Sequence, residues 1–227
     1  MTGSPDPIAL ARADILERLE AAAKSVHRSS REITLVAVSK KQPEARIDAM
    51  LATGQRVFGE NRVQEAQARW QARREQINDL SLRLIGPLQT NKAEHAVALF
   101  DVIETLDRDK LAKALRSAMD KLGKTPRLYV QVNTGDEPQK AGVSVADLPD
   151  FLARCRDEHG LAIEGLMCIP PVEEPASLHF ALLKKLTEQH GLSECSMGMS
   201  ADFELAAKLG ATSVRVGSAL FGERPSA

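Results

Sequence analysis

The chain has 227 residues, of which 43% are hydrophobic, so it can bury a substantial core, and its length fits one large α/β domain better than two average ones. Lysine and arginine total 30 against 31 acidic residues, and the resulting net charge of -1 gives no global field that favours nucleic acid or an anionic membrane. The first 32 residues lack a signal-peptide pattern, and no stretch approaches the roughly 20 apolar residues of a membrane span. We therefore expect a cytoplasmic protein.

The predicted elements begin with a helix over residues 7–27. Eight short apolar runs follow, and longer amphipathic stretches separate them, several of which end in a glycine that suits a left-handed helix end. Strict alternation of strand and helix predicts parallel strands joined by right-handed crossovers, and eight repeats close a (β/α)8 barrel. The eight runs are 33–40, 56–61, 82–86, 101–106, 127–133, 161–169, 194–199 and 212–217.

An open, doubly wound parallel sheet is the alternative fold. No GxGxxG follows the first apolar run, so the dinucleotide-binding version of that alternative lacks its fingerprint. We predict a single domain over residues 1–227, with a helical segment at 1–32 and the barrel at 33–222. The opening helix is expected to cover the barrel where a last helix is missing.

The cysteines and histidines give no sign of a disulfide frame or a metal centre. Cys155, Cys168 and Cys195 are odd in number and lie in apolar surroundings, which is typical of reduced thiols that pack as small hydrophobic side chains. Neither CxxC nor HExxH occurs, and the five histidines are scattered. We therefore expect no metal site built from protein ligands.

The carboxyl ends of the predicted strands hold the candidate functional residues, because barrel enzymes place their chemistry on that face. The last residues of each run and the loops that follow them give Lys40 or Lys41, Asn61, Gly86, Thr105, Asn133, Met167, Met199 with Ser200, and Arg215 with Gly217 and Ser218.

The ends of the seventh and eighth runs favour an anion. Ser200 is expected at the start of a helix, and Gly217 with Ser218 precedes a short helical turn. Helix N-termini bind anions, and barrels commonly seat phosphate at these two loops, so a phosphate fits here. The alternative is that both serines are ordinary N-caps.

Arg215 lies inside an apolar strand, where an unpaired guanidinium would be costly to bury, so it requires a partner. Either a glutamate near the barrel mouth or a bound ligand would serve. Asn61 and Asn133 have a similar pair of interpretations, since each can cap the turn after its strand or contact a ligand.

The two lysines that end the first run raise the question of covalent chemistry. A lysine near its ordinary pKa of ~10.4 is protonated at neutral pH, whereas partial desolvation or a nearby cation lowers that pKa and frees the amine to attack a carbonyl. Buried parallel strands are apolar on both faces, so alternation does not choose between Lys40 and Lys41. The alternative is a solvated lysine at a strand end.

Several segments together resemble the pyridoxal phosphate homeostasis protein family, single-domain relatives of the barrel of alanine racemase. The matching segments run in order from about residue 33 to residue 222. They are LVAVSKKQP, FGENRVQEA, IGPLQTNK, VNTGDEPQKAG, GLMCIPP and SMGMSADFELAAKLGATSVRVGSALFG. The resemblance implies a TIM barrel like the N-terminal domain of alanine racemase.

The resemblance also implies roles for particular residues toward pyridoxal 5'-phosphate (PLP). Lys40 is expected to hold the cofactor as a covalent Schiff base, Arg215 to face the pyridine nitrogen, and Asn61 to line the ring. The phosphate is expected at Ser200, Gly217 and Ser218. Since arginine stays protonated, it would donate to the pyridine nitrogen and keep it unprotonated, which makes the ring a weak electron sink.

The sequence departs from the family pattern just before IGPLQ. The family often has histidine and phenylalanine there, whereas this chain has Arg83 and Leu84. No role of that histidine is therefore carried over to this chain.

Three functions from different classes remain open at this point. The first is a PLP-binding protein of intracellular vitamin B6 homeostasis with little or no turnover, monomeric, exchanging cofactor transiently with apo-enzymes, and binding neither nucleic acid nor membrane. The second is an amino-acid racemase or decarboxylase. Racemases of this fold take their second catalytic base, a tyrosine, from a further β domain, and Tyr129 of this chain is expected to pack in the core instead. The third is a phosphosugar aldolase, for which only Glu60 and Glu104 offer carboxylates at strand ends. Glu104 is equally suited to pair with a cation at the mouth.

Overall fold

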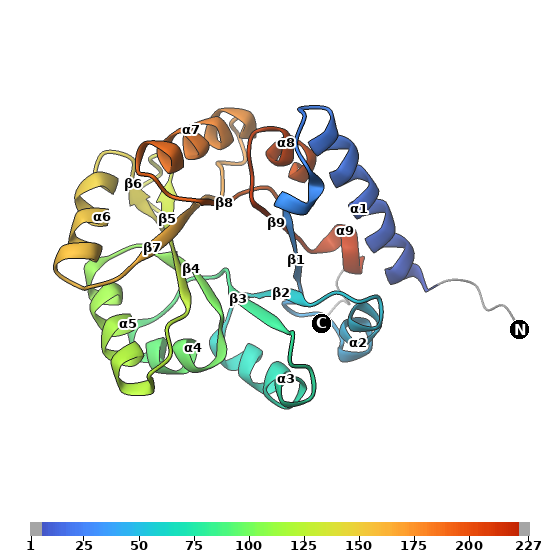
Figure 1. The fold of residues 1–227 in the computed structure, drawn as a ribbon, viewed down its shortest axis with the longest axis horizontal. Coiled ribbons are helices and arrows are strands. Elements are labelled where there is room, and N and C mark those ends of the chain that lie inside the picture. Colours follow the sequence, from blue (N-terminus) through green and yellow to red (C-terminus); the bar gives the residue numbers. More distant parts are fainter. Residues whose placement is uncertain (1–5, 223–227) are drawn as a thin grey trace, which may run out of the picture.

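The computed structural model describes residues 6–222, and the outermost ends of the predicted domain, 1–227, lie outside the described residues. Eight parallel strands follow one another around a closed barrel, because β9 pairs with β1 and sets Arg215 opposite Val36. Helices surround the strands (Figure 1). The strands of the barrel are β1 (Thr34–Val38), β2 (Val57–Glu60), β3 (Ser81–Leu84), β4 (Val102–Leu106), β5 (Arg127–Asn133), β7 (Ile163–Met167), β8 (Glu194–Ser196) and β9 (Ser213–Val216).

The closed barrel confirms the predicted fold class and excludes the open sheet. Each of the eight predicted runs overlaps a strand, although most strands are shorter than their runs and β3 begins one residue before its run. The sequence did not predict β6 (Val143–Ser144), a two-residue strand that pairs with β5 outside the ring of eight.

The outer layer consists mainly of α-helices that turn an apolar face toward the strands. In α5, Leu111, Leu115, Ala118 and Met119 recur at helical spacing and are buried, and Gly123 ends the helix at a φ of 60°. The α-helices are α1 (Pro7–Lys24), α2 (Glu44–Ala52), α3 (Val63–Gln76), α4 (Ala93–Leu99), α5 (Asp109–Leu122), α6 (Leu148–Asp157), α7 (Ala176–Gln189), α8 (Phe203–Lys208) and α9 (Ser218–Phe221). Two short 3-10 turns are Ser30–Glu32 and Thr90–Lys92.

Helix α1 covers the barrel beside its shortest helices, as predicted. It begins at Pro7 with Asp6 as N-cap, whose Oδ1 accepts the N–H of Ile8 at 2.8 Å. It lies against α8 and α9 (Figure 1), and Arg18 forms an ion pair with Glu204 of α8 at 3.0 Å. Because α9 has only four residues, α1 supplies the apolar cover that a longer last helix would give.

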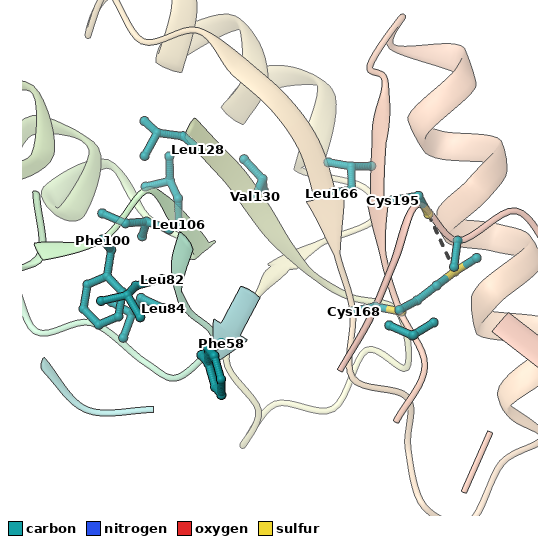
Figure 2. Packing of buried hydrophobic residues seen from close by; sticks show 14 of the residues in the cluster. Phe58, Leu82, Leu84, Phe100, Leu106, Leu128, Val130, Leu166, Cys168 and Cys195 are labelled. Atoms are coloured by element: carbon teal, nitrogen blue, oxygen red, sulfur yellow. Dashed lines mark hydrogen bonds between the residues drawn. The ribbon is translucent and has the colours of Figure 1, made fainter. Parts of the chain in front are cut away.

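The apolar core lies between the strands and the helices, and the inside of the barrel is partly polar. Leu82 and Leu84 of β3 pack against Phe100 in the outer core (Figure 2), whereas Arg83 between them points the other way, into the barrel. The expectation that the strands would be apolar on both faces is therefore wrong for β3.

The cysteines pack as small hydrophobic side chains, as predicted. All three are buried and free, and Cys195 Sγ contacts Met197 Sδ at 3.6 Å (Figure 2). Within residues 6–222, no helix is long and apolar enough to cross a membrane, and no group of three or more histidine, cysteine or acidic side chains is placed to hold a metal ion.

Candidate functional site

Four consecutive strand ends bring most of the candidate residues to one sector of the barrel mouth. The order β8, β9, β1, β2 places Ser200, the Gly217–Ser218 turn, Lys40 and Asn61 in succession around the carboxyl edge. Lys40, Gly217 and Ser218 line the same small cavity of about 30 Å³. The amine of a strand-end lysine and the turn predicted to bind phosphate are therefore neighbours.

The two lysines after β1 differ in conformation and surroundings. Lys41 is exposed and has a φ of 58°, a left-handed conformation that turns the chain toward α2. Lys40 is partly buried and lines the cavity, whereas Lys41 does not. The geometry thus favours Lys40 as the residue that meets a ligand.

Helix α3 fixes the loop that carries the lysine. Arg69 donates to the carbonyl oxygens of Ser39 at 2.9 Å and Gln42 at 3.0 Å, on either side of the lysine pair. Glu60 Oε1 accepts from Ser39 Oγ at 2.7 Å, Arg69 at 2.9 Å and Trp70 Nε1 at 3.0 Å. Glu60 was a candidate catalytic carboxylate in the aldolase hypothesis. In the structure it faces α3 and holds the lysine loop. Sequence reasoning missed Arg69, since an arginine in an amphipathic helix gives no sign of a distant partner.

The predicted phosphate turn has two N–H groups that converge on one oxygen. Ser200 Oγ accepts from the backbone N–H of Gly217 at 3.2 Å and of Ala219 at 3.4 Å. The N-cap alternative for the serines is wrong, because Asp202 is the N-cap of α8 and Ser218 is the first residue of α9, after Gly217. The turn thus presents the kind of donors that an oxyanion takes.

Arg215 is part of a buried polar network inside the barrel. Its guanidinium donates to Ser196 Oγ at 2.6 Å and to the carbonyl of Cys168 at 2.7 Å, and it is only 4% exposed. Ser196 Oγ donates in turn to Glu104 Oε2 at 2.6 Å, and Glu104 lies 4.0 Å from Arg215. The interpretation of Glu104 as the partner of a mouth cation is confirmed. The guanidinium has more N–H groups than these two bonds use, so donors remain for a ligand.

The residue that departs from the family pattern belongs to the same network. Arg83 is 4% exposed and donates to Glu104 Oε1 at 3.1 Å, while its Nε has no hydrogen-bond partner among the described residues. Two arginines therefore share one carboxylate, which leaves positive charge inside the barrel. Leu84 keeps an apolar role in the outer core (Figure 2).

Tyr129 and Asn133 take the structural roles considered for them. Tyr129 is fully buried, and burial raises its pKa above the usual value. Its position early in β5, opposite Gly165, sets it away from the strand end. Asn133 closes the turn after β5, because its Nδ2 donates to the Glu137 carbonyl at 2.9 Å and its Oδ1 accepts the N–H of Glu137 at 3.3 Å.

Asn61 has a side-chain acceptor without a partner. Its Oδ1 is buried and makes no hydrogen bond within the described part of the chain, so it does not cap the turn. Gly86 packs closely behind it: a Cβ on Gly86 would lie 2.4 Å from the Asn61 carbonyl oxygen, and Thr105 Oγ1 donates to the Gly86 carbonyl at 2.9 Å. Of the remaining candidates, Met167 is buried and Met199 is exposed, and within residues 6–222 neither side chain forms a polar contact.

Comparison with known proteins gives consistent matches over nearly the whole chain. The family model described as alanine racemase, N-terminal domain, matches residues 15–225. The pyridoxal phosphate homeostasis protein of Escherichia coli K12 is 34% identical over 221 residues, which cover 93% of this chain and 94% of that protein. The protein of the same description from Pseudomonas aeruginosa is 38% identical over 220 residues, with 93% and 94% coverage.

Solved structures agree with these matches. The structure of PipY from Synechococcus elongatus with PLP bound is 40% identical in sequence and has a TM-score of 0.77. The match covers 92% of this chain and 100% of PipY. Alanine racemase from Corynebacterium glutamicum is 19% identical with a TM-score of 0.65, and 62% of it is covered, so this likeness concerns the fold alone.

Proposed function

Because the chain belongs to the pyridoxal phosphate homeostasis protein family, with the barrel of the alanine racemase N-terminal domain, we propose that it binds PLP and helps control the intracellular concentration of this cofactor. The observation that carries the proposal is the shared cavity of Lys40, Gly217 and Ser218, next to the two N–H groups that converge on Ser200. The PLP-bound structure of the relative PipY supports it.

The residues at the mouth fit the chemical groups of PLP. Lys40 offers an amine for a covalent Schiff base, and Ser200, Gly217 and Ser218 offer hydroxyl and N–H donors for the phosphate. Arg215 would offer an N–H donor to the pyridine nitrogen, and Asn61, whose Oδ1 has no partner among the described residues, would line the ring. When bound, PLP supplies an aldehyde that reacts reversibly with amines.

Other residues of the protein hold and orient the side chains that would contact the cofactor. Arg69 and Glu60 fix the loop before and after the lysine, so the amine stays beside the phosphate turn. Ser196 and Cys168 fix the guanidinium of Arg215 in place. Such a site favours retention of the cofactor over strong stabilisation of a carbanion.

We further propose that the protein turns over amino acids slowly or not at all. Three groups were candidates for a second acid or base, and each is engaged or distant. Glu60 is bonded to α3, Glu104 is held by Arg83 and Ser196, and Tyr129 is buried early in its strand. A racemase requires a base on each face of the substrate Cα, and none of these three groups is placed to act as the second.

In this proposal the protein works as a monomer in the cytoplasm and passes PLP to apo-enzymes in transient encounters. The test combines two assays on the full chain loaded with PLP: reactivation of an apo-transaminase, and exchange of the Cα proton with change of chirality over a panel of L-amino acids. We expect reactivation without appreciable racemisation. Efficient racemisation or decarboxylation of one amino acid, without release of cofactor, would overturn the proposal.

A further inference from the structure

A second, larger cleft opens at the barrel mouth on the side away from the phosphate turn. Its volume is about 670 Å³, and it lies between the loops that follow β2, β3 and β4. Residues 61–64 and 87–89 line it together with Lys92 and Arg108. The phosphate turn follows β8 and β9, and β1 separates the two places, so the cleft is distinct from that turn. Asn61 is the residue that borders both the cleft and the expected position of the cofactor ring.

Among residues 6–222, those that line the cleft include three cations and no carboxylate. Arg62, Lys92 and Arg108 come from three successive loops, while the remaining lining residues are apolar or amides. Like charges gathered around one cavity repel one another, and an anion in the cavity relieves that repulsion. Helix α3 also begins here at Val63 with no side-chain cap, so the backbone N–H groups of its first turn add further donors.

The charges remain available to a ligand. Within residues 6–222, Lys92 Nζ takes part in no hydrogen bond or ion pair. Arg62 pairs with Glu65 at 3.2 Å, but its side chain is 72% exposed, so this pair is weak and open to competition. Arg108 pairs with Asp107, which lies outside the lining of the cleft.

The walls of the cleft are fixed before any ligand binds. Arg108 donates to the Leu88 carbonyl at 2.8 Å and thereby ties the loop after β4 to the loop after β3. Gly86 lies so close to Asn61 that no side chain fits between them, which ties the loop after β3 to the loop after β2. A preformed cavity lowers the entropic cost of binding.

We propose that this cleft binds a small oxyanion, a carboxylate-bearing or phosphate-bearing molecule, beside the cofactor. Its position next to PLP rests on the proposed function, whereas the binding of the anion itself does not. A molecule held here by its anionic group reaches the mouth from the side opposite the phosphate turn. The cleft would therefore select which anionic compounds approach the bound cofactor.

The test uses the full chain loaded with PLP, so that the phosphate turn is occupied, titrated by calorimetry with succinate in one arm and inorganic phosphate in the other. We expect at least one of the two anions to bind. The double substitution Arg62→Ala and Lys92→Ala is expected to weaken this binding about tenfold or more. Lys185→Ala removes one exposed positive charge from α7, far along the chain from the cleft, and is expected to leave the affinity unchanged.

The outcomes separate this inference from the proposed function. Loss of anion binding with full retention of PLP in the double variant supports a separate anion site. If the wild-type chain binds neither anion at millimolar concentrations while still binding PLP, the inference fails and the proposed function stands. If the double variant binds anions as tightly as the wild type, or loses anions and PLP together, the cleft is not a separate anion site. Circular dichroism of both variants confirms that they are folded.

Discussion

Replacing Glu104 by glutamine tests whether the buried network holds the barrel interior together. Glu104 is fully buried and is the only carboxylate within residues 6–222 that is bonded to this network, since it accepts from Arg83 at 3.1 Å and from Ser196 at 2.6 Å and lies 4.0 Å from Arg215. Glutamine has almost the same shape but carries no charge. The substitution therefore leaves two buried guanidinium groups without their counter-charge.

The expected loss follows from that geometry. Breaking a buried ion pair by removing one partner destabilises a protein by about 3 to 5 kcal/mol. The glutamine oxygen still accepts one hydrogen bond, so we expect the lower end, about 3 kcal/mol of unfolding free energy. For a chain of this length each kcal/mol lowers the melting temperature by about 2 to 4 °C, which predicts a fall of about 6 to 12 °C.

Urea unfolding followed by circular dichroism measures this loss, and Glu44→Gln is the matched control. Glu44 also contacts two arginines, Arg69 at 3.0 Å and Arg73 at 2.7 Å, but its side chain is 54% exposed. We expect the control to lose less than about 1 kcal/mol. Adding Arg83→Met to the Glu104 variant removes one uncompensated charge and should recover part of the loss. Equal losses in the Glu104 and Glu44 variants would show that burial of the Glu104 network does not determine its contribution to stability.

Three further predictions concern the loop, the phosphate turn and the thiols. Arg69→Met removes the two hydrogen bonds from Arg69 to carbonyl oxygens of the lysine loop and should speed the release of PLP in a dialysis assay, whereas Arg156→Met, on the exposed surface of α6, should not. Ser218→Ala should weaken PLP retention about tenfold and leave the weak binding of unphosphorylated pyridoxal unchanged, and an equal effect on both aldehydes would contradict the phosphate role. Burial raises the pKa of the folded thiols from 9.0 to about 12 for Cys155 and Cys168 and to about 11 for Cys195, so they should react with a disulfide reagent at pH 8 only on unfolding. Since the unfolded thiols lose their protons first, the free energy of unfolding should fall as pH rises from about 9 toward 11, and a flat profile there would contradict the shifts.

The strands could be predicted because their signal is local. Each strand of the barrel is a short apolar run, and its position follows from the helices on either side. The ends of the strands could not be predicted. For example, the run 161–169 continues past Met167 with apolar residues, although Met167 is the last paired position of β7. The two residues of β6 form a strand only because β5 offers an edge, which no local pattern reveals.

The candidate site shows the same limit more sharply. Its residue types and strand ends were visible in the sequence, but the partners were not. Capping of its own helix was one of two interpretations of Ser200, but its oxygen meets N–H groups that lie 17 and 19 residues away along the chain. Arg83 and Glu104 are 21 residues apart and meet only because adjacent strands turn both side chains inward. Such contacts depend on the register of the barrel.

The lysine to which PLP attaches decides whether Lys40 holds the cofactor. The full chain is incubated with PLP, reduced with borohydride, digested, and mapped by mass spectrometry. Because Lys40 lines the cavity with Gly217 and Ser218 while Lys41 is exposed in a left-handed turn, we predict the pyridoxyl group on Lys40, and loss of the visible imine absorption in Lys40→Ala but not in Lys41→Ala. Labelling of Lys41 or Lys140 instead, or an imine that survives in Lys40→Ala, would show that Lys40 does not hold the cofactor.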